Sequence, residues 1–197
     1  DSPAGPSELL VLCDASADAG TVAREMLAQA EHDPCAAVVA VASSAQLANA
    51  IIAELRLQIG TQPRAEIIAA ALAGQGAVLW TDSLQEAVAF ANAYAAEHLL
   101  LMTANCDAVL ASLRNTGTVF VGASASVAFG DYMTGANHVL PTGGTARAYS
   151  GLSPLDFVRW TTYHRASEGA AARLAGDVRV LAEAEGLPGH AAAAARR

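Results

Sequence analysis

The chain contains no lysine, and all eleven of its basic residues are arginine. Schiff-base chemistry on a lysine, a phosphate-loop lysine and a pyridoxal phosphate anchor are therefore excluded, because each needs a titratable amine. Aromatic residues are also few, at 5% of the 197 residues. Since 53% of the residues are hydrophobic, the chain still has enough apolar side chains to bury a substantial core.

Cysteine and basic charge are both scarce. The three cysteines, Cys13, Cys35 and Cys106, are odd in number and widely spaced, which predicts neither a disulfide framework nor a cysteine zinc site and fits a reducing cytoplasm. A net charge of −8 without a basic cluster argues against nucleic acid or an anionic membrane as partner. No apolar run is long enough to span a membrane, and Asp1 begins neither a signal peptide nor an obvious translation start. We therefore expect a cytoplasmic chain that begins within a longer protein.

Short apolar runs alternate with helical patterns through most of the chain. Strands are expected at 9–13, 38–41, 76–80, 99–102 and 118–121, and helices at 19–31, 44–59, 64–73, 83–94 and 107–113. This alternation predicts an α/β fold, an incomplete Rossmann-like and mostly parallel sheet with helices on both faces. Because no Gly-x-Gly-x-x-Gly follows the first strand, we do not expect NAD to bind here in the usual Rossmann manner.

The pattern becomes helical after Gly151. Helices are expected at 154–162 and 167–185, followed by an alanine-rich tail. We therefore expect two domains, an α/β domain over 1–151 and a helical C-terminal arm over 152–197. The arm has too little apolar surface to fold alone, so we expect it to pack on another surface.

One loop and three short motifs concentrate polar residues. The loop 130–147 carries Asp131 and His138 between glycines, and connecting segments of this kind often aim side chains at a ligand. Gln29 and His32 are three residues apart on an expected helix, so both can reach one ion. Each motif also has an ordinary explanation, a surface turn for the loop and a polar helix end for the Gln-His pair.

The Glu97-His98 pair is expected where a helix runs into a strand. Adjacent carboxyl and imidazole groups can transfer protons near neutral pH. The alternative is an exposed helix end with two ordinary polar residues. Ser7 follows Gly5-Pro6, where a hydroxyl in a turn would ordinarily cap the backbone.

Together these segments resemble the histidinol dehydrogenase family. The matching segments are Asp-Ser-Pro-Ala-Gly-Pro-Ser-Glu at 1–8, the Gln-x-x-His pair, the Glu-His pair, the Gly-Asp-Tyr…Asn-His-Val-Leu-Pro-Thr loop at 130–142 and Leu-Ser…Asp-Phe at 152–157. They occur in the family's order and extend over the whole chain. Only the C-terminal part of the family's sequence is present.

The resemblance implies a site for zinc and histidinol. The zinc ligands, for one ion per subunit, would be Gln29, His32, Asp131 and His190. His98 would act as general base towards the alcohol, and Glu97 would activate the water that hydrates the aldehyde. The histidinol pocket would comprise Ser7, Gln29, His32, His98, Asp131, His138, Glu185 and His190. The NAD contacts are expected upstream of Asp1.

The activity implied by the resemblance is the zinc- and NAD-dependent oxidation of L-histidinol through L-histidinal to L-histidine, the last steps of histidine biosynthesis. The C-terminal arm would cross to the partner subunit of a homodimer, so that each zinc takes His190 from the neighbouring chain. This chain alone would be an incomplete enzyme. Two alternatives remain open, an NAD-independent zinc hydrolase or lyase and a non-catalytic truncated paralogue.

Overall fold

The computed structural model describes residues 4–195, so the first three residues of the motif at 1–8 lie outside the described residues. The chain divides into two compact units, Asp1–Asp156 and Phe157–Arg197. The sequence pattern placed the boundary after Gly151, slightly earlier along the chain.

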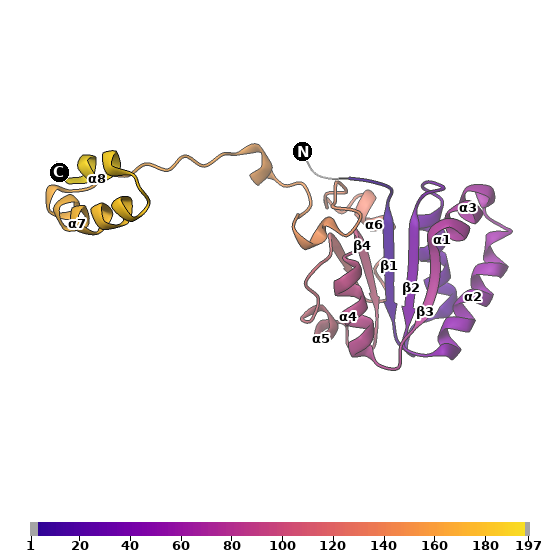
Figure 1. Ribbon diagram of the computed structural model, residues 1–197. Helices are drawn as coiled ribbons and strands as arrows, with labels where there is room; N and C mark the ends of the chain where they lie inside the picture. Colours follow the sequence, from indigo (N-terminus) through magenta and orange to yellow (C-terminus); the bar gives the residue numbers. More distant parts are fainter. Residues whose placement is uncertain (1–3, 196–197) are drawn as a thin grey trace. The chain divides into compact units, whose positions relative to one another are not determined.

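The first unit is built on a five-stranded parallel sheet with the order β3-β2-β1-β4-β5 (Figure 1). Its strands are β1 (Glu8–Cys13), β2 (Ala37–Ala42), β3 (Gly76–Trp80), β4 (His98–Met102) and β5 (Thr118–Val121). Every neighbouring pair is parallel, including the central β1 and β4, where Leu9 pairs with His98. The expected α/β fold is confirmed.

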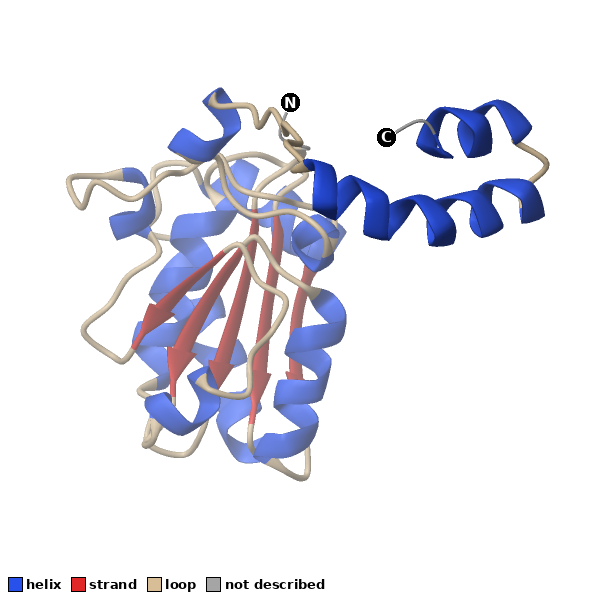
Figure 2. Ribbon diagram, turned by 90° about the vertical axis from the view of Figure 1, so that its left-hand side faces the viewer, coloured by secondary structure: helices blue, strands red, loops and turns tan. Residues whose placement is uncertain are grey.

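Helices cover both faces of the sheet, as Figure 2 shows. One face carries α1 (Ala19–Ala30), α2 (Ala45–Ile59) and α3 (Ala65–Gln75), and the other carries α4 (Leu84–Tyr94) and α5 (Cys106–Leu110). Asp18, Ser44 and Ser83 cap the first three long helices that follow strands, because each side chain accepts a backbone N–H of the first turn. Burial of aliphatic residues from both sheet faces makes two apolar layers, which is the pattern expected of a central parallel sheet.

All five strands begin at the same edge of the sheet, here called the amino edge. Helices that connect parallel strands run back against them, so α1 also ends at this edge, with Gln29 in its last turn. The segment after β5 returns here through the short helix α6 (Ala128–Asp131) and the turn η1 (Thr145–Arg147). Residues from distant parts of the sequence therefore meet at the amino edge.

The last part of the chain contains η2 (Pro154–Phe157), α7 (Glu168–Ala184) and α8 (Pro188–Ala195). The helix expected over 154–162 is wrong beyond Phe157, since residues 158–167 form no helix. The run Thr161-Thr162-Tyr163 has low helix propensity, and Trp160 is 90% exposed, so neither propensity nor burial supports a helix there. Among the described residues, no helix is long and apolar enough to cross a membrane.

Candidate proton-transfer site at the amino edge

Glu97 and His98 form a buried pair at the start of β4. Their side chains are only 7% and 5% exposed, and Glu97 Oε2 lies 3.4 Å from His98 Nδ1. A three-residue connection from α4 leads directly into β4. The pair therefore lies at the amino edge of the sheet and not on a free helix end. The alternative of an exposed helix end is wrong.

The two ring nitrogens of His98 have different surroundings. Nδ1 lies 3.1 Å from the backbone oxygen of Glu8, whereas Nε2 is buried and has no hydrogen-bond partner among the described residues. A carbonyl can only accept, so Nδ1 carries the proton in the neutral ring and Nε2 presents its lone pair. The ring stacks on Phe120 at a centroid distance of 5.8 Å. This arrangement leaves Nε2 as the nitrogen available to a substrate proton.

The pKa of His98 reflects opposing influences. Burial lowers this pKa, but the hydrogen bond and charge of Glu97, the carbonyl of Glu8 and the charge of Asp131 together raise it above its ordinary value. Because the Glu97 carboxylate lies next to the His98 ring, the protonated form of the imidazole is stabilised here. The site can therefore both accept a proton at Nε2 and hold the resulting cation.

Glu8 and Glu97 exchange hydrogen bonds across β1 and β4. Glu97 Oε2 accepts from Glu8 N at 2.8 Å, and Glu8 Oε2 accepts from Glu97 N at 3.3 Å. The other oxygen of Glu8 accepts from Gly143 N at 2.8 Å. Gly143 and Gly144 have φ values of 62° and 74°, left-handed conformations that favour glycine and account for the double glycine in this turn.

His32 and Asp131 approach one another beside this pair, and Gln29 lies buried in the last turn of α1. His32 Nε2 lies 3.8 Å from Asp131 Oδ2, and Gln29 is 1% exposed with a side-chain nitrogen that has no partner among the described residues. Glu25 accepts from Val127 N at 2.8 Å and from Ser126 Oγ at 3.0 Å, which ties the start of α6 to α1. Glu25 and Gln29 lie one turn apart on α1, and His32 follows two residues after the helix ends, so this end of α1 faces the segment that carries Asp131.

A glycine before Asp131 allows this close approach. A Cβ on Gly130 would lie 2.8 Å from Phe120 Cζ and 3.7 Å from His98 Nε2. Any larger residue would push against the ring that supports His98. Gly130 therefore sets the spacing between α6 and β4.

These residues fit a divalent cation. Imidazole nitrogen with carboxylate and amide oxygens is a donor set that zinc accepts, and a half-turn of the buried Gln29 amide would present its oxygen to the same space. The negative end of the α1 dipole adds attraction for a cation. Among residues 4–195, no group of three or more His, Cys, Asp and Glu side chains converges. Of the expected ligands of those types, His32 and Asp131 belong to the first unit and His190 to the second.

The remaining expected residues have varied positions. Ser7 directly precedes Glu8 and accepts Ala37 N through its backbone oxygen at 3.0 Å, so it lies at the amino edge. His138 is exposed in the loop between α6 and η1. Glu185 ends α7 and His190 lies in α8, both exposed and both in the second unit. Their expected roles stay predictions.

The opposite edge of the sheet does not fit a dinucleotide phosphate. The loop after β1 is Asp14-Ala15-Ser16-Ala17-Asp18, and the Asp14 carboxylate accepts Ser16 N and Ala104 N, both at 2.9 Å. Folds of this kind bind pyrophosphate in the crevice between β1 and β4. Here the Asp14 carboxylate already occupies backbone N–H groups at that crevice, and its negative charge would repel a phosphate.

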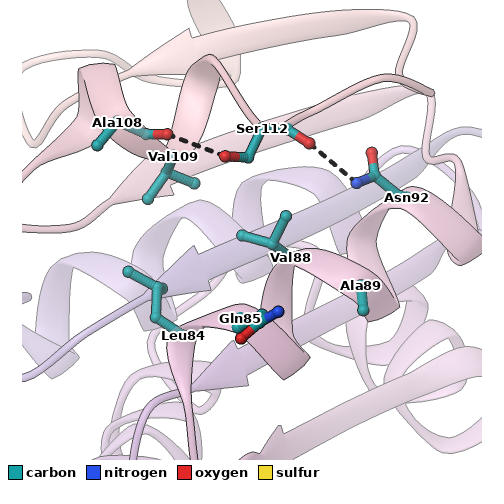
Figure 3. Close-up of a pocket in the computed structure, with 8 residues that line it drawn as sticks. All are labelled: Leu84, Gln85, Val88, Ala89, Asn92, Ala108, Val109 and Ser112. Atoms are coloured by element: carbon teal, nitrogen blue, oxygen red, sulfur yellow. Dashed lines mark hydrogen bonds between the residues drawn. The ribbon is translucent and has the colours of Figure 1, made fainter.

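A cavity of about 520 Å³ lies between α4 and α5 (Figure 3). Its lining is mainly aliphatic and amide, and Asn92 Nδ2 donates to the backbone oxygen of Ser112 at 3.1 Å across it. No acid, base or thiol lines this cavity. This cavity therefore offers no side chain that titrates near neutral pH.

Sequence patterns alone did not single out Glu8, Glu25, Phe120 or Gly130. Glu8 offered one usable signal, because it is a charged residue at the start of an otherwise buried apolar strand. Glu25 stands one helical turn before Gln29, which also could have marked it. Phe120 and Gly130 become meaningful only when β5 and α6 are placed beside His98.

The fold and the site together define an α/β domain with a buried proton-transfer pair beside nitrogen and oxygen donors. The sequence profile of one family, histidinol dehydrogenase, matches residues 1–197. The chain belongs to the histidinol dehydrogenase family.

Three relatives illustrate the match. Identity is 48% over 200 residues to the histidinol dehydrogenase of Methanopyrus kandleri, covering 100% of this chain and 46% of that protein. It is 46% over 197 residues to the histidinol dehydrogenase of Methanothermobacter thermautotrophicus, covering 100% and 46%. The crystal structure of histidinol dehydrogenase from Elizabethkingia anophelis superposes with a TM-score of 0.92 at 34% identity, covering 99% of this chain and 45% of that one. This chain thus spans about half the length of the relatives it matches.

Proposed function

We propose that this chain supplies the proton-transfer and substrate-binding part of a zinc- and NAD-dependent histidinol dehydrogenase that converts L-histidinol through L-histidinal to L-histidine. The observation that carries this proposal is the buried Glu97-His98 pair, whose free Nε2 faces the side of Gly130 and Asp131. Oxidation of an alcohol requires a base at the hydroxyl, and an imidazole with an unengaged nitrogen meets that need.

His98 would take the hydroxyl proton at Nε2 while Nδ1–H stays bound to the Glu8 carbonyl. Glu97, 3.4 Å away, would stabilise the imidazolium that forms. In the second oxidation, the Glu97 carboxylate would draw a proton from the water that adds to the aldehyde. Ser7 and His138 would contact the substrate, as the family resemblance implies.

Gln29, His32 and Asp131, with His190 from the arm, would hold zinc. Bound zinc would supply a fixed positive charge that orients the substrate's imidazole and amino groups, since this ion has no redox chemistry. NAD, bound by segments outside this chain, would supply the hydride acceptor. Glu185 would pair with the substrate's ammonium group.

We also propose a cytoplasmic homodimer in which the arm reaches the neighbouring subunit. Support comes from the second unit itself, whose helices bury only Ala182 and Ala191. Its large apolar residues stay exposed, with Val180 at 64% and Leu181 at 61%. Apolar surface of this extent favours a covering partner. The three free cysteines fit the cytoplasm.

The test separates the two half-reactions. In a protein that joins this chain to the rest of the family's sequence, Glu97→Gln should slow oxidation of supplied L-histidinal more than oxidation of L-histidinol to the aldehyde. His98→Asn should slow both, each by about 10²–10⁴-fold. Glu86→Gln on the exposed surface of α4 is the matched control. Equal losses in both half-reactions for Glu97→Gln would refute the division of roles, and NAD-independent turnover would replace the proposed activity with a hydrolytic one.

A further inference from the structure

The carboxylate of Glu8 has no part in the chemistry proposed above, yet it accepts two hydrogen bonds at the site. It accepts the backbone N–H groups of Glu97 and Gly143, while the Glu8 backbone faces His98 through its oxygen and Glu97 through its N–H. These bonds connect residues 89 and 135 positions apart in the sequence. One residue thus joins the first strand, the proton-transfer pair and the double-glycine turn.

Folding stability alone does not favour placing the carboxylates of Glu8 and Glu97 next to each other in a buried position. Glu8 and Glu97 repel each other as carboxylates, and burial raises the pKa of Glu8 in spite of the N–H groups of Gly143 and Glu97 that lower it. Each carboxylate is held by the other's backbone, so neither can turn without losing a charge-assisted hydrogen bond. Such mutual restraint fixes a direction for the Glu97 side chain.

The turn that Glu8 holds also borders a cavity of about 250 Å³, which is lined by Gly5, Pro6, Glu8, Cys35, Ala37, Gln75, Thr142 and Gly143. Thr142 is 7% exposed and packs closely on the segment before β1, since a Cβ on Gly5 would lie 3.0 Å from its Oγ1. Movement of the turn would therefore change the wall of the cavity and the surroundings of Ser7.

We infer that Glu8 is a positioning residue for the Glu97-His98 pair: its carboxylate binds the double-glycine turn to Glu97 and keeps the turn and the pair in one fixed arrangement. This inference rests on the proposed function, because it assigns Glu8 to the same reaction. It adds a connection between proton transfer and the loop that carries Thr142 to Thr145. Glu8 itself contacts no reacting atom.

Asp14 provides a matched control on the same two strands. Its carboxylate also accepts two backbone N–H groups, those of Ser16 and Ala104, and so links β1 to β4 at the opposite edge of the sheet. Asp14→Ala removes comparable hydrogen bonds without touching the amino edge. A general loss of stability would affect the amino edge in both variants, whereas loss of the Glu8 contacts affects it in the Glu8 variants alone.

The experiment uses nitrogen-15 NMR of the 197-residue chain and therefore needs no enzymatic activity. Glu8→Ala should accelerate amide hydrogen exchange at Gly143 and Glu97 by about tenfold, as expected for loss of one hydrogen bond. It should also shift the ring nitrogen resonances of His98. Asp14→Ala should leave these signals at their wild-type positions. Glu8→Gln keeps one acceptor oxygen in the same shape, so it should preserve the protection of one of the two amides and lose the other.

Kinetics of the protein joined to the rest of the family's sequence provide a second readout. Loss of positioning should lower kcat about tenfold or more with KM nearly unchanged, and Glu8→Gln should recover part of the loss. A rise in KM alone would make Glu8 a substrate contact and overturn the inference. So would unchanged exchange at Gly143 and Glu97 in both Glu8 variants. If the wild-type protein does not oxidise histidinol, the proposed function fails while the NMR comparison still decides the role of Glu8.

Discussion

At the scale of single residues, the environment of one imidazole governs the chemistry. His98 is buried against Phe120 and bound through Nδ1, while its buried Nε2 has no hydrogen-bond partner among the described residues. A free histidine on the surface would titrate near its ordinary pKa and exchange tautomers. Here the carbonyl of Glu8 selects the tautomer and the carboxylate of Glu97 raises the pKa, so neighbours set both properties that a base needs.

The first prediction concerns the pH dependence of His98. Glu97 contributes to its raised pKa by hydrogen bond and by charge, with smaller contributions from Glu8 and Asp131, so Glu97→Gln should lower that pKa. A general base works only when it is deprotonated, so the rising limb of kcat/KM plotted against pH should move to lower pH in the Glu97→Gln variant. The maximal kcat/KM of this variant should also be lower than that of the wild type. NMR titration of the ring in the 197-residue chain measures the same shift directly. An upward or absent shift would show that Glu97 does not stabilise the imidazolium.

A second prediction concerns the space beside His98. Gly130→Ala places a Cβ 2.8 Å from Phe120 Cζ, so the aromatic ring must move or α6 must shift. We expect a loss of about 1–3 kcal/mol in the free energy of unfolding by urea. The control is Gly74→Ala in α3, whose Cβ would meet only the oxygen of Pro34 at 4.0 Å. This control should gain about 0.5–1 kcal/mol from helix propensity, and a Gly130→Ala variant as stable as the wild type would contradict the close approach.

At the scale of elements, the sequence determined more of the fold than of the site. Strands and helices of the first unit matched apolar runs and capping residues such as Ser44, because period and capping are local properties. The helix expected over 154–162 was wrong beyond Phe157, where no core enforces regular structure. Glu97 and His98 were found as a motif, but their burial depends on the pairing of β1 with β4, which no local pattern contains.

The third prediction concerns the contact between α1 and α6. Glu25 holds the first turn of α6 through Val127 N and Ser126 Oγ, and so fixes Asp131 near His32. If these residues bind zinc as proposed, Glu25→Ala should weaken zinc affinity by about 10–100-fold, as is typical of groups that orient ligands.

Competition with a chromophoric chelator measures this affinity. Glu54→Ala on α2 is the control, because Glu54 accepts from Gln58 within its own helix and lies on another element. Equal zinc affinity in the Glu25 variant and the control would mean that α6 is held in place without Glu25.

At the scale of the whole molecule, the site lies at an unusual edge. Open parallel sheets commonly bind ligands at the carboxyl ends of their strands, whereas Glu8, His98 and the end of α1 lie at the amino edge. The connection that enters β4 is short, and the proposed base His98 is the first residue of that strand, directly after Glu97. Rigid strands therefore carry the chemical groups, and the loop with Asp131 completes the arrangement.

The fourth prediction tests the proposed arm exchange. In a protein that joins this chain to the rest of the family's sequence, His190→Ala and His98→Asn should each be inactive alone and partly active when mixed. One site of each mixed dimer would combine an intact body with an intact arm, and random pairing gives about half mixed dimers, hence roughly a quarter of the sites active. Activity is measured after unfolding and refolding the variants together. No recovery from dimers shown to be mixed would mean that each arm serves its own subunit.

The hydrogen bonds between Glu8 and Glu97 also determine at which stage of folding the site can form. They close a separation of 89 residues, and the intervening chain contains β2, β3 and α4. Closing so long a loop is entropically costly, and parallel pairing at long range is slow. During synthesis, α1 can form while β4 has not yet been made. A molecule that has not completed this pairing lacks the Glu8 carbonyl beside His98 Nδ1 and the Glu97–Glu8 hydrogen bond, so the environment that sets the tautomer of His98 depends on a contact made late in the sequence.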